Sequence, residues 1–300
     1  TRMKSELPKV LHSVAGKPML EYSIDLSKKL NASKTAVVIG SGAEKVREAF
    51  KGSNVSFYEQ REQLGTAHAV LAAEEAIAAH KGNVLIMCGD MPNVQAETLQ
   101  DYLNTVNPAF PSFISVHQSN PKGYGRVLRN ANGVQIIEEK DADEQTKQIT
   151  EINTGIYYCE AAELLKRLKN VSNKNAQKEY YLTDIIGKGS EAWLADNEDE
   201  FHGINDRVQL AAVSKIIWKQ RAVSLMQQGV SIIDPDSTYI SAETEIASDV
   251  TVWPNTYFQG RCKVASRCEI YHGVRIVDSE IAENNLIREN TLIEECSIGP

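Results

Sequence analysis

The sequence lacks several features that would place it in other functional classes. It has no apolar run of 18 residues and no signal-peptide pattern, so we expect neither membrane insertion nor secretion. Basic charge is not in excess, because 32 Lys and Arg residues stand against 40 Asp and Glu residues, for a net charge of −8. A nucleic-acid or anionic-membrane partner needs a basic field, so we expect no such partner. The five cysteines are odd in number and show no CxxC spacing, which indicates reduced thiols in a cytoplasmic protein.

From residue 240 onward the sequence repeats every six residues. The apolar positions of the repeat are Ile240, Ile246, Val252, Phe258, Val264, Ile270 and Ile276. Small or β-branched side chains follow four residues later, at Thr244, Val250, Thr256, Cys262, Cys268 and Val274. An α-helix cannot keep this period, because 3.6 does not divide six, whereas each flat face of a triangular parallel β-helix takes six residues. We therefore predict a left-handed β-helix of hexapeptide repeats, whose register slips by one residue at Ile281, Ile287, Ile293 and Ile298.

The preceding two hundred residues alternate short β-rich runs with amphipathic segments. Strands are predicted at residues 34–40, 55–59, 84–88, 112–117, 134–138 and 155–159. Helices are predicted at residues 20–30, 43–50, 66–80, 97–106, 161–169 and 182–194. This alternation indicates βαβ units in an α/β, Rossmann-like domain with a mostly parallel sheet, whose ligands bind beyond the carboxyl ends of the strands.

The pattern divides the chain into three parts. Residues 1–205 form the α/β domain, residues 206–229 form a long connecting helix stopped at Gly229, and residues 230–300 form the first coils of the β-helix. Solenoids of this type usually trimerise and are appended to enzymes that act on small molecules, so we expect a homotrimer.

Two stretches of the α/β domain carry the residue types that bind nucleotides. Arg2 and Lys9 are two cations seven residues apart that could hold a polyphosphate, although two solvated surface cations would look the same. Gln60 ends a strand, Gly65 permits a tight turn and Thr66 begins a helix. Such a turn can read a pyrimidine through the Gln60 amide, or it can be a plain strand–turn–helix junction in which Thr66 is the N-cap.

Further polar residues follow the predicted strands. An apolar strand leads into Gly89 and Asp90, a position for a Mg²⁺-binding carboxylate or for an ordinary turn residue before proline. A loop of the form Gly-Tyr-Gly at 123–125, the acidic run at 138–141 and a neutral amide at Asn153 have the residue types that bind a sugar and its N-acetyl group. Asn205 could bind a metal or cap the connecting helix, and residue type alone favours capping.

The order of these parts resembles one family along essentially the whole chain. The most specific stretches are Thr1-Arg2-Met3 with Leu7-Pro8-Lys9-Val10-Leu11-His12, Gln63-Leu64-Gly65-Thr66-Ala67-His68-Ala69, Glu151-Ile152-Asn153-Thr154-Gly155 and Glu179-Tyr180-Tyr181-Leu182-Thr183-Asp184. They are similar to the bacterial bifunctional N-acetylglucosamine-1-phosphate uridylyltransferase and glucosamine-1-phosphate acetyltransferase. The resemblance implies a cytoplasmic enzyme that makes UDP-N-acetylglucosamine and pyrophosphate from UTP and N-acetylglucosamine 1-phosphate, for cell-wall biosynthesis.

The resemblance also implies roles for individual residues. By position, Arg2 and Lys9 match catalytic cations on the nucleotide phosphates, Gln60, Gly65 and Thr66 match the uracil-reading turn, and Gly89 lies beside the nucleotide. Asp90 and Asn205 match the pair that holds the Mg²⁺ cofactor. Gly125, Glu138 and Asn153 match residues that line the amino-sugar pocket, with Glu138 rather than Glu139 aligned to the acidic position.

The sequence departs from the family pattern at both ends. The glycine-rich nucleotide loop that precedes Thr-Arg-Met in the family is absent, and the acetyl-transfer residues of a full-length parent would lie beyond Pro300, so we expect a chain cut at both ends. Two other functions stay open. One is a glucose-1-phosphate adenylyl- or thymidylyltransferase, and the other is a non-catalytic trimeric scaffold that binds a sugar nucleotide.

Overall fold

The computed structural model describes residues 3–131 and 133–300 of the 300-residue chain. Within that range the chain divides into two compact units. Residues 5–11 and 20–202 form the first, which we call the sheet unit. Residues 3–4, 12–19 and 203–300 form the second, which we call the solenoid unit. These bounds differ from the predicted domain limits, because residues 12–19 group with the C-terminal part of the chain.

The sheet unit is built on a six-stranded sheet and a smaller parallel pair. The large sheet has the order β10-β6-β9-β7-β8, and β5 also pairs with β9. Its strands are β5 (Asn83–Ile86), β6 (Ser112–His117), β7 (Arg126–Asn130), β8 (Gly133–Ile137), β9 (Glu151–Glu160) and β10 (Glu191–Ala195). The smaller pair is β3 (Ala36–Ile39) and β4 (Ser56–Glu59). The predicted strands are therefore present, whereas β7 and β10 were not predicted.

Strand direction in the large sheet is mixed around the long strand β9. β9 is antiparallel to β5, β6 and β7, so these three strands point the same way, and β10 joins them because it is parallel to β6. β8 opposes β7. Most strands thus share one direction, as the α/β prediction requires, but the hydrogen-bonded neighbours of β9 are antiparallel.

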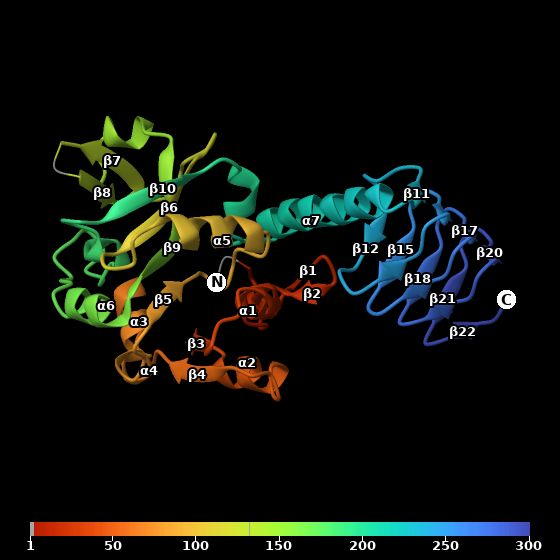
Figure 1. The fold of residues 1–300 in the computed structure, drawn as a ribbon, viewed down its shortest axis with the longest axis horizontal. Helices are drawn as coiled ribbons and strands as arrows, with labels where there is room; N and C mark the ends of the chain where they lie inside the picture. The colour runs from red at the N-terminus through yellow and green to blue at the C-terminus, as the bar shows by residue number, and fades with distance from the viewer. Residues whose placement is uncertain (1–2, 132) are drawn as a thin grey trace. The chain divides into compact units, whose positions relative to one another are not determined.

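Helices cover both faces of this sheet. The helices of the unit are α1 (Met19–Lys29), α2 (Ala43–Ala49), α3 (Thr66–Leu71), α4 (Glu74–Ala78), α5 (Ala96–Thr105) and α6 (Ala161–Leu168), with the short 3₁₀ turns η1 (Lys9–Leu11), η2 (Thr146–Gln148), η3 (Leu182–Ile185) and η4 (Glu198–Phe201). Adjacent residues of β6 point to opposite faces, since Phe113 packs with α3, α4 and α6 while Ile114 packs with α5. Figure 1 shows α5 lying across the sheet. Cover on both faces is typical of strands with continuous apolar runs, such as Val84-Leu85-Ile86 in β5.

Two helix predictions in this unit need correction. The segment 182–194 is not a helix, because η3 ends at Ile185 and β10 begins at Glu191. Gly189, with φ of 85°, takes the left-handed conformation between them, which a helix cannot contain. The segment 66–80 is two helices, α3 and α4, separated at Ala72 and Ala73.

The solenoid unit stacks short parallel strands into three sheets, which Figure 1 shows as parallel ribbons. The first sheet contains β11 (Ser231–Ile232), β14 (Thr251–Val252), β17 (Glu269–Ile270) and β20 (Leu286–Ile287). The second contains β12 (Tyr239–Ile240), β15 (Tyr257–Gln259), β18 (Arg275–Val277) and β21 (Leu292–Glu294). The third contains β13 (Glu245–Ile246), β16 (Lys263–Val264), β19 (Glu280–Ile281) and β22 (Ser297–Ile298). Three sheets of parallel strands in rotation are the predicted β-helix.

The register confirms the six-residue repeat. Tyr239 pairs with Tyr257 and Tyr257 pairs with Arg275, so one coil takes eighteen residues, or three repeats. Arg275 then pairs with Leu292, seventeen residues on, which is the predicted slip. The repeat's apolar positions from Ile240 to Ile293 form one buried core, and the second column, from Thr244 to Val274, is buried beside it.

From β13 onward, each turn between solenoid sheets contains a residue with positive φ, which the sequence analysis did not predict. These residues are Asp249, Asn255, Gly260, Arg267, Gly273, Asp278, Asn284, Asn290 and Glu295. Glycine, asparagine and aspartate tolerate the left-handed region best, and they fill most of these corners.

The solenoid unit also contains the connecting helix α7 (Arg207–Gln227) and the antiparallel pair β1 (Ser13–Val14) and β2 (Lys17–Pro18). Asp206 caps α7, because its side chain accepts hydrogen bonds from the backbone N–H groups of Val208 and Gln209. Ala222 and Leu225 of α7 belong to the solenoid core, and Trp218 packs edge-on against Tyr239 at 4.9 Å. α7 is therefore packed on the first coils of the β-helix.

Two further observations concern membranes and thiols. Among the described residues no helix combines the length and apolar character needed to cross a membrane. The five cysteines are free thiols, three of them buried.

Candidate active site

The loop after β5 carries the predicted metal-binding carboxylate. Asp90 lies beyond the carboxyl end of β5, and its Oδ2 is 2.5 Å from Nζ of Lys9 in η1. Both side chains are partly exposed, at 22% for Asp90 and 31% for Lys9. Gly89 packs against Val10 and Leu20, because a Cβ built there would lie 3.2 Å from Leu20 Cδ1. Three predicted site residues thus meet at this edge of the sheet, and a cation already contacts the Asp90 carboxylate.

The predicted nucleobase turn is docked on the segment 180–182. Tyr180 N–H donates to Leu64 O at 2.8 Å, and Tyr180 O accepts from Ala67 N–H at 2.9 Å. Leu182 N–H donates to Thr66 Oγ1 at 2.9 Å. Gly65 has φ of 114°, and a Cβ on it would lie 2.5 Å from Tyr180 O, so only glycine fits. Two of the most specific sequence stretches are therefore joined in space.

The capping prediction for this turn is wrong in one respect. Gly65, not Thr66, holds the N-cap position of α3, and no side chain caps the helix there. The Thr66 hydroxyl instead accepts the hydrogen bond from Leu182. Gln60 Nε2 donates to Gly65 O at 3.1 Å and lies 3.2 Å from His68 Nδ1. The donor end of the Gln60 amide is thus engaged within the turn, which leaves its oxygen as the end suited to a ligand.

The three predicted amino-sugar residues lie on one rung of the sheet. Arg126 of β7 pairs with Ile137 of β8 and with Ile152 of β9. Gly125, Glu138 and Asn153 are the next residues beyond these three. Asn153 N–H donates to Gly125 O at 2.9 Å, and a Cβ on Gly125 would lie 3.6 Å from Glu138 Oε2. We call this set the sugar rung.

Two residues that the sequence reading missed contact the sugar rung. Thr183 donates its hydroxyl hydrogen to Glu138 Oε1 at 3.1 Å. Asn153 Nδ2 donates to the Tyr157 hydroxyl at 2.6 Å, and Asn153 Oδ1 accepts from Gly155 N–H at 3.0 Å. Thr183 lies in a quoted stretch, but nothing in its spacing places it opposite Glu138. Burial raises the pKa of the Glu138 carboxyl, and the Thr183 hydrogen bond opposes that shift.

Gly155 and Cys88 connect the sugar rung to the Asp90 loop. Gly155 has φ of 86°, and a Cβ on it would lie 3.2 Å from Cys88 Sγ. Cys88 directly precedes Gly89 and Asp90, while Gly155 lies two residues after Asn153. The predicted residues of the sheet unit therefore form a continuous set, from Asp90 through the sugar rung and Thr183 to the Gln60–Thr66 turn.

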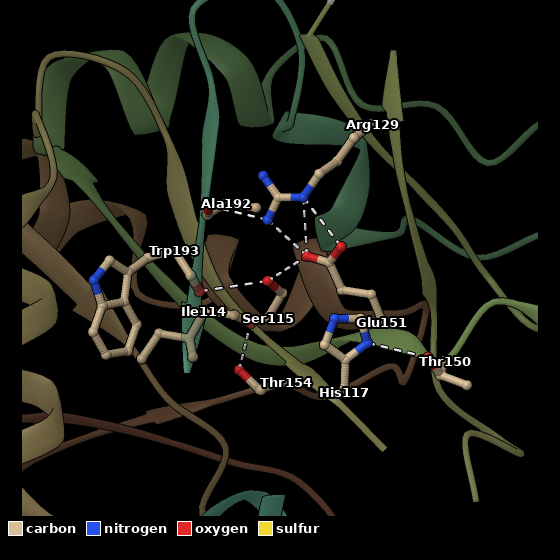
Figure 2. A network of polar contacts seen from close by, with 9 residues as sticks. All are labelled: Ile114, Ser115, His117, Arg129, Thr150, Glu151, Thr154, Ala192 and Trp193. Carbon is tan, nitrogen blue, oxygen red and sulfur yellow. Dashed lines mark hydrogen bonds and ion pairs between the residues drawn. The ribbon is translucent and has the colours of Figure 1, made fainter. Parts of the chain in front are cut away.

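A polar network joins β6, β7, β9 and β10 where β9 begins (Figure 2). Arg129 of β7 donates from Nη2 to Glu151 Oε1 at 2.7 Å and to Ala192 O at 3.3 Å. Ser115 of β6 donates to Glu151 Oε1, also at 2.7 Å. Burial acts to raise the pKa of Glu151, but the hydrogen bonds from Arg129 and Ser115 outweigh it and hold the pKa below its ordinary value. The network ties four strands together two residues before Asn153.

Two predicted residues lie outside this set. Asn205 belongs to the solenoid unit, where its backbone N–H donates to Gln209 Oε1 at 2.7 Å. It does not take the N-cap position of α7, which Asp206 holds. Arg2 lies outside the described residues.

Comparisons with known proteins identify the family. Residues 1–176 match the model of the MobA-like NTP transferase domain. The bifunctional protein GlmU of Syntrophomonas wolfei is 40% identical over 314 residues, which cover 100% of this chain and 70% of that protein. GlmU of Carboxydothermus hydrogenoformans is 41% identical over 316 residues, with 100% and 70% covered. GlmU of Streptococcus gordonii is 41% identical over 311 residues, with 100% and 67% covered.

The chain belongs to the GlmU family. Membership confirms the predicted uridylyltransferase function and its two substrate classes, a nucleotide and a sugar phosphate. Enzymes of this nucleotidyltransferase class generally use a divalent metal. The chain spans about 70% of the length of its GlmU relatives.

A solved structure supports the predicted fold class. A protein of Bacillus anthracis described as a glucose-1-phosphate thymidylyltransferase, in complex with sucrose, superposes with a TM-score of 0.55. The match covers 69% of this chain and 85% of that one, at 15% identity. At this identity the likeness concerns the fold alone.

Proposed function

We propose that the protein transfers the uridylyl group of UTP to N-acetylglucosamine 1-phosphate, which yields UDP-N-acetylglucosamine and pyrophosphate. The observation that carries this proposal is the continuity of the site. Thr183 joins the sugar rung at Glu138, and Tyr180 and Leu182 of the same segment hold the Gly65 turn. A base-reading turn and a sugar-reading rung joined by one short segment fit a ligand that has a base at one end and a sugar at the other.

The chemistry needs positioning more than proton transfer. The sugar phosphate is already an anion near neutral pH, so its oxygen attacks the α-phosphorus of UTP without a general base. A P–O bond forms to the α-phosphorus as the bond to pyrophosphate breaks, and pyrophosphate leaves with the electron pair. Lys9 and Arg2 would hold the phosphates and neutralise the charge that develops on the leaving group.

The donor types fit Mg²⁺. Asp90 offers carboxylate oxygens and Asn205 offers an amide oxygen, which are the hard ligands that Mg²⁺ prefers, and the Lys9 contact indicates that the Asp90 position accepts a cation. When bound, Mg²⁺ would supply Lewis-acid polarisation of the phosphates.

Specificity would come from the two ends of the site. The Gln60 amide oxygen is the end suited to accept the N3–H hydrogen of uracil, since its Nε2 is bound to Gly65 O. The Glu138 carboxylate would accept sugar hydroxyl hydrogens. The Asn153 amide makes internal hydrogen bonds to Tyr157 and Gly155 and can make up to four in all, so it has capacity to bind the N-acetyl group.

The remaining predictions belong to the same proposal. The α/β part of the chain would perform nucleotidyl transfer, and the β-helix would assemble a homotrimer. The free thiols are those expected in a reducing cytoplasm.

A substrate panel tests the proposal. The protein is given UTP, ATP or dTTP with N-acetylglucosamine 1-phosphate or glucose 1-phosphate in Mg²⁺, and pyrophosphate release is measured. We expect the highest kcat/KM for UTP with the N-acetylated sugar. A preference for ATP or dTTP with glucose 1-phosphate would replace the proposal by the adenylyl- or thymidylyltransferase alternative. Calorimetric binding of UDP-N-acetylglucosamine without turnover of any pair would favour the non-catalytic scaffold.

A further inference from the structure

Arg126 is a buried cation directly beside the sugar rung. Its side chain is 2% exposed, and its Nη2 forms an ion pair with Glu139 Oε2 at 2.8 Å. Nη1 donates to Tyr124 O, and Nη2 also lies 3.4 Å from Lys147 O. Among the described residues, neither Arg126 Nε nor Glu139 Oε2 has a hydrogen-bond partner, so the two side chains are joined as an ion pair. A buried guanidinium is costly unless it is compensated, so this arrangement depends on Glu139 and on the two carbonyl groups.

Arg126 and Glu139 each adjoin a member of the sugar rung. Gly125 precedes Arg126, and Glu138 precedes Glu139, so the ion pair links the two chain segments that carry these residues. The Arg126 backbone also pairs with Ile152, whose neighbour Asn153 completes the rung. A Cβ on Gly125 would lie 2.9 Å from Ile136, so Gly125 and its neighbours on β8 are closely packed. A shift of Arg126 therefore displaces Gly125 relative to Glu138.

We propose that the Arg126–Glu139 ion pair is a positioning device that sets the spacing of Gly125, Glu138 and Asn153 for the amino sugar. This inference rests on the proposed function, because it assumes that the sugar rung binds the N-acetylglucosamine 1-phosphate. Arg126 touches no substrate in this scheme and acts through its neighbours. Loss of the pair weakens the sugar phosphate site and leaves the UTP site unchanged.

The chain offers a matched control in the same strand. Arg129 lies three residues after Arg126 in β7 and pairs with Glu151 (Figure 2). Both ion pairs join β7 to a neighbouring acidic residue, but the Arg129 side chain is 48% exposed and its hydrogen bonds go to Glu151 and Ala192 rather than to the sugar rung. Arg129→Lys therefore alters an ion pair of similar chemistry near the other end of β7.

The test compares Michaelis constants for the two substrates in the full chain. Arg126→Lys keeps the charge but loses the planar fork, and we expect the KM for N-acetylglucosamine 1-phosphate to rise about tenfold, with the KM for UTP changed less than about twofold. Glu139→Gln, at a side chain that is 24% exposed, is a milder second variant that should shift the same KM in the same direction even if Arg126→Lys does not fold. Arg129→Lys should leave both KM values within about twofold.

A double variant separates a lost ion pair from general damage. The double variant Arg126→Met/Glu139→Leu removes both charges. We expect its KM for N-acetylglucosamine 1-phosphate to be lower than that of Arg126→Met alone, which leaves the Glu139 carboxylate unpaired. Equal rises in both KM values, or an unchanged sugar KM in Arg126→Lys and Glu139→Gln, would overturn the inference. Failure of the wild-type protein to use UTP and N-acetylglucosamine 1-phosphate would instead reject the proposed function, which the wild-type assay reports separately.

Discussion

The hydroxyl of Thr183 donates to Glu138 Oε1 at 3.1 Å, which fixes a half-buried carboxylate at the β8 end of the sugar rung. Leu182, the preceding residue, donates its N–H to Thr66 in the nucleobase turn. One dipeptide thus contacts both ends of the proposed ligand site.

The pH dependence of sugar binding follows from this contact. Burial raises the pKa of Glu138, so its carboxylate is protonated at a higher pH than an exposed glutamate would be. The KM for the sugar phosphate should therefore rise as the pH falls. The Thr183 hydrogen bond lowers that pKa, so Thr183→Val should move the rise in KM to higher pH, whereas Thr183→Ser should not. The measurement is KM for each substrate between about pH 5 and 8. An identical pH profile in Thr183→Val and wild type would contradict this prediction.

Removal of the Glu138 charge should raise the stability of the fold and weaken binding of the sugar phosphate. A carboxyl whose pKa is raised in the folded state contributes stability below its unfolded pKa and loses that contribution as pH rises through the folded pKa. At neutral pH the ionised carboxylate is therefore a cost, and Glu138→Gln should raise the thermal midpoint while the sugar KM increases. Below the unfolded pKa of glutamate, the two midpoints should converge. A lower midpoint for Glu138→Gln at pH 7 would show that the charge is net stabilising.

Gly65 and Gly123 test the docking of the nucleobase turn as a matched pair. Both have positive φ, 114° and 90°, so an alanine is strained at each. A Cβ on Gly65 would lie 2.5 Å from Tyr180 O, whereas one on Gly123 would have no atom of the described residues within 4 Å. Gly65→Ala should therefore raise the KM for UTP by about tenfold or more, and Gly123→Ala should cost only the backbone strain, about 1 kcal/mol of stability. Equal effects of the two variants on the KM for UTP would reject the docking argument.

The solenoid core should tolerate little loss of volume. Ile270 is fully buried in that core, so Ile270→Ala should cost about 3–4 kcal/mol of local stability. Leu292 is 61% exposed on β21, and Leu292→Ala should change stability by no more than about 0.5 kcal/mol. Hydrogen exchange of the strand amides in the solenoid unit measures both effects without assuming two-state unfolding of the whole chain. Similar exchange rates in the two variants would mean that the Ile270 column is not the source of the solenoid's stability.

The solenoid was predictable to the residue because its period is local and uninterrupted. Each six-residue repeat places one side chain in the solenoid core. The register slip at Ile281 is visible as a change of spacing in the sequence. The corners were not predicted. Asn and Asp mark several of them, but Arg267 and Glu295 also adopt positive φ, and nothing in those residue types announces it.

The sheet unit was predictable in its elements but not in its pairing. Segment 182–194 has apolar residues at helical spacing, which predicts a helix, although Gly187 and Gly189 are breaking signals. The antiparallel insertion of β9 is a long-range pairing that leaves no local pattern. The same holds for the site. Gln60, Glu138 and Asn153 could be singled out by residue type and family resemblance, whereas Thr183 and the Arg126–Glu139 pair become visible only when the strands are in register.

The most direct test of the central claim is the Mg²⁺-dependent release of pyrophosphate from UTP and N-acetylglucosamine 1-phosphate by wild type and by Asp90→Asn. Asp101→Asn, at an exposed position of α5, serves as the control. If Asp90 holds the metal on the substrate phosphates, kcat should fall by about 100-fold or more in Asp90→Asn, with an unchanged thermal midpoint, and stay near wild type in Asp101→Asn. Near wild-type turnover by Asp90→Asn at the same Mg²⁺ concentration would contradict the account.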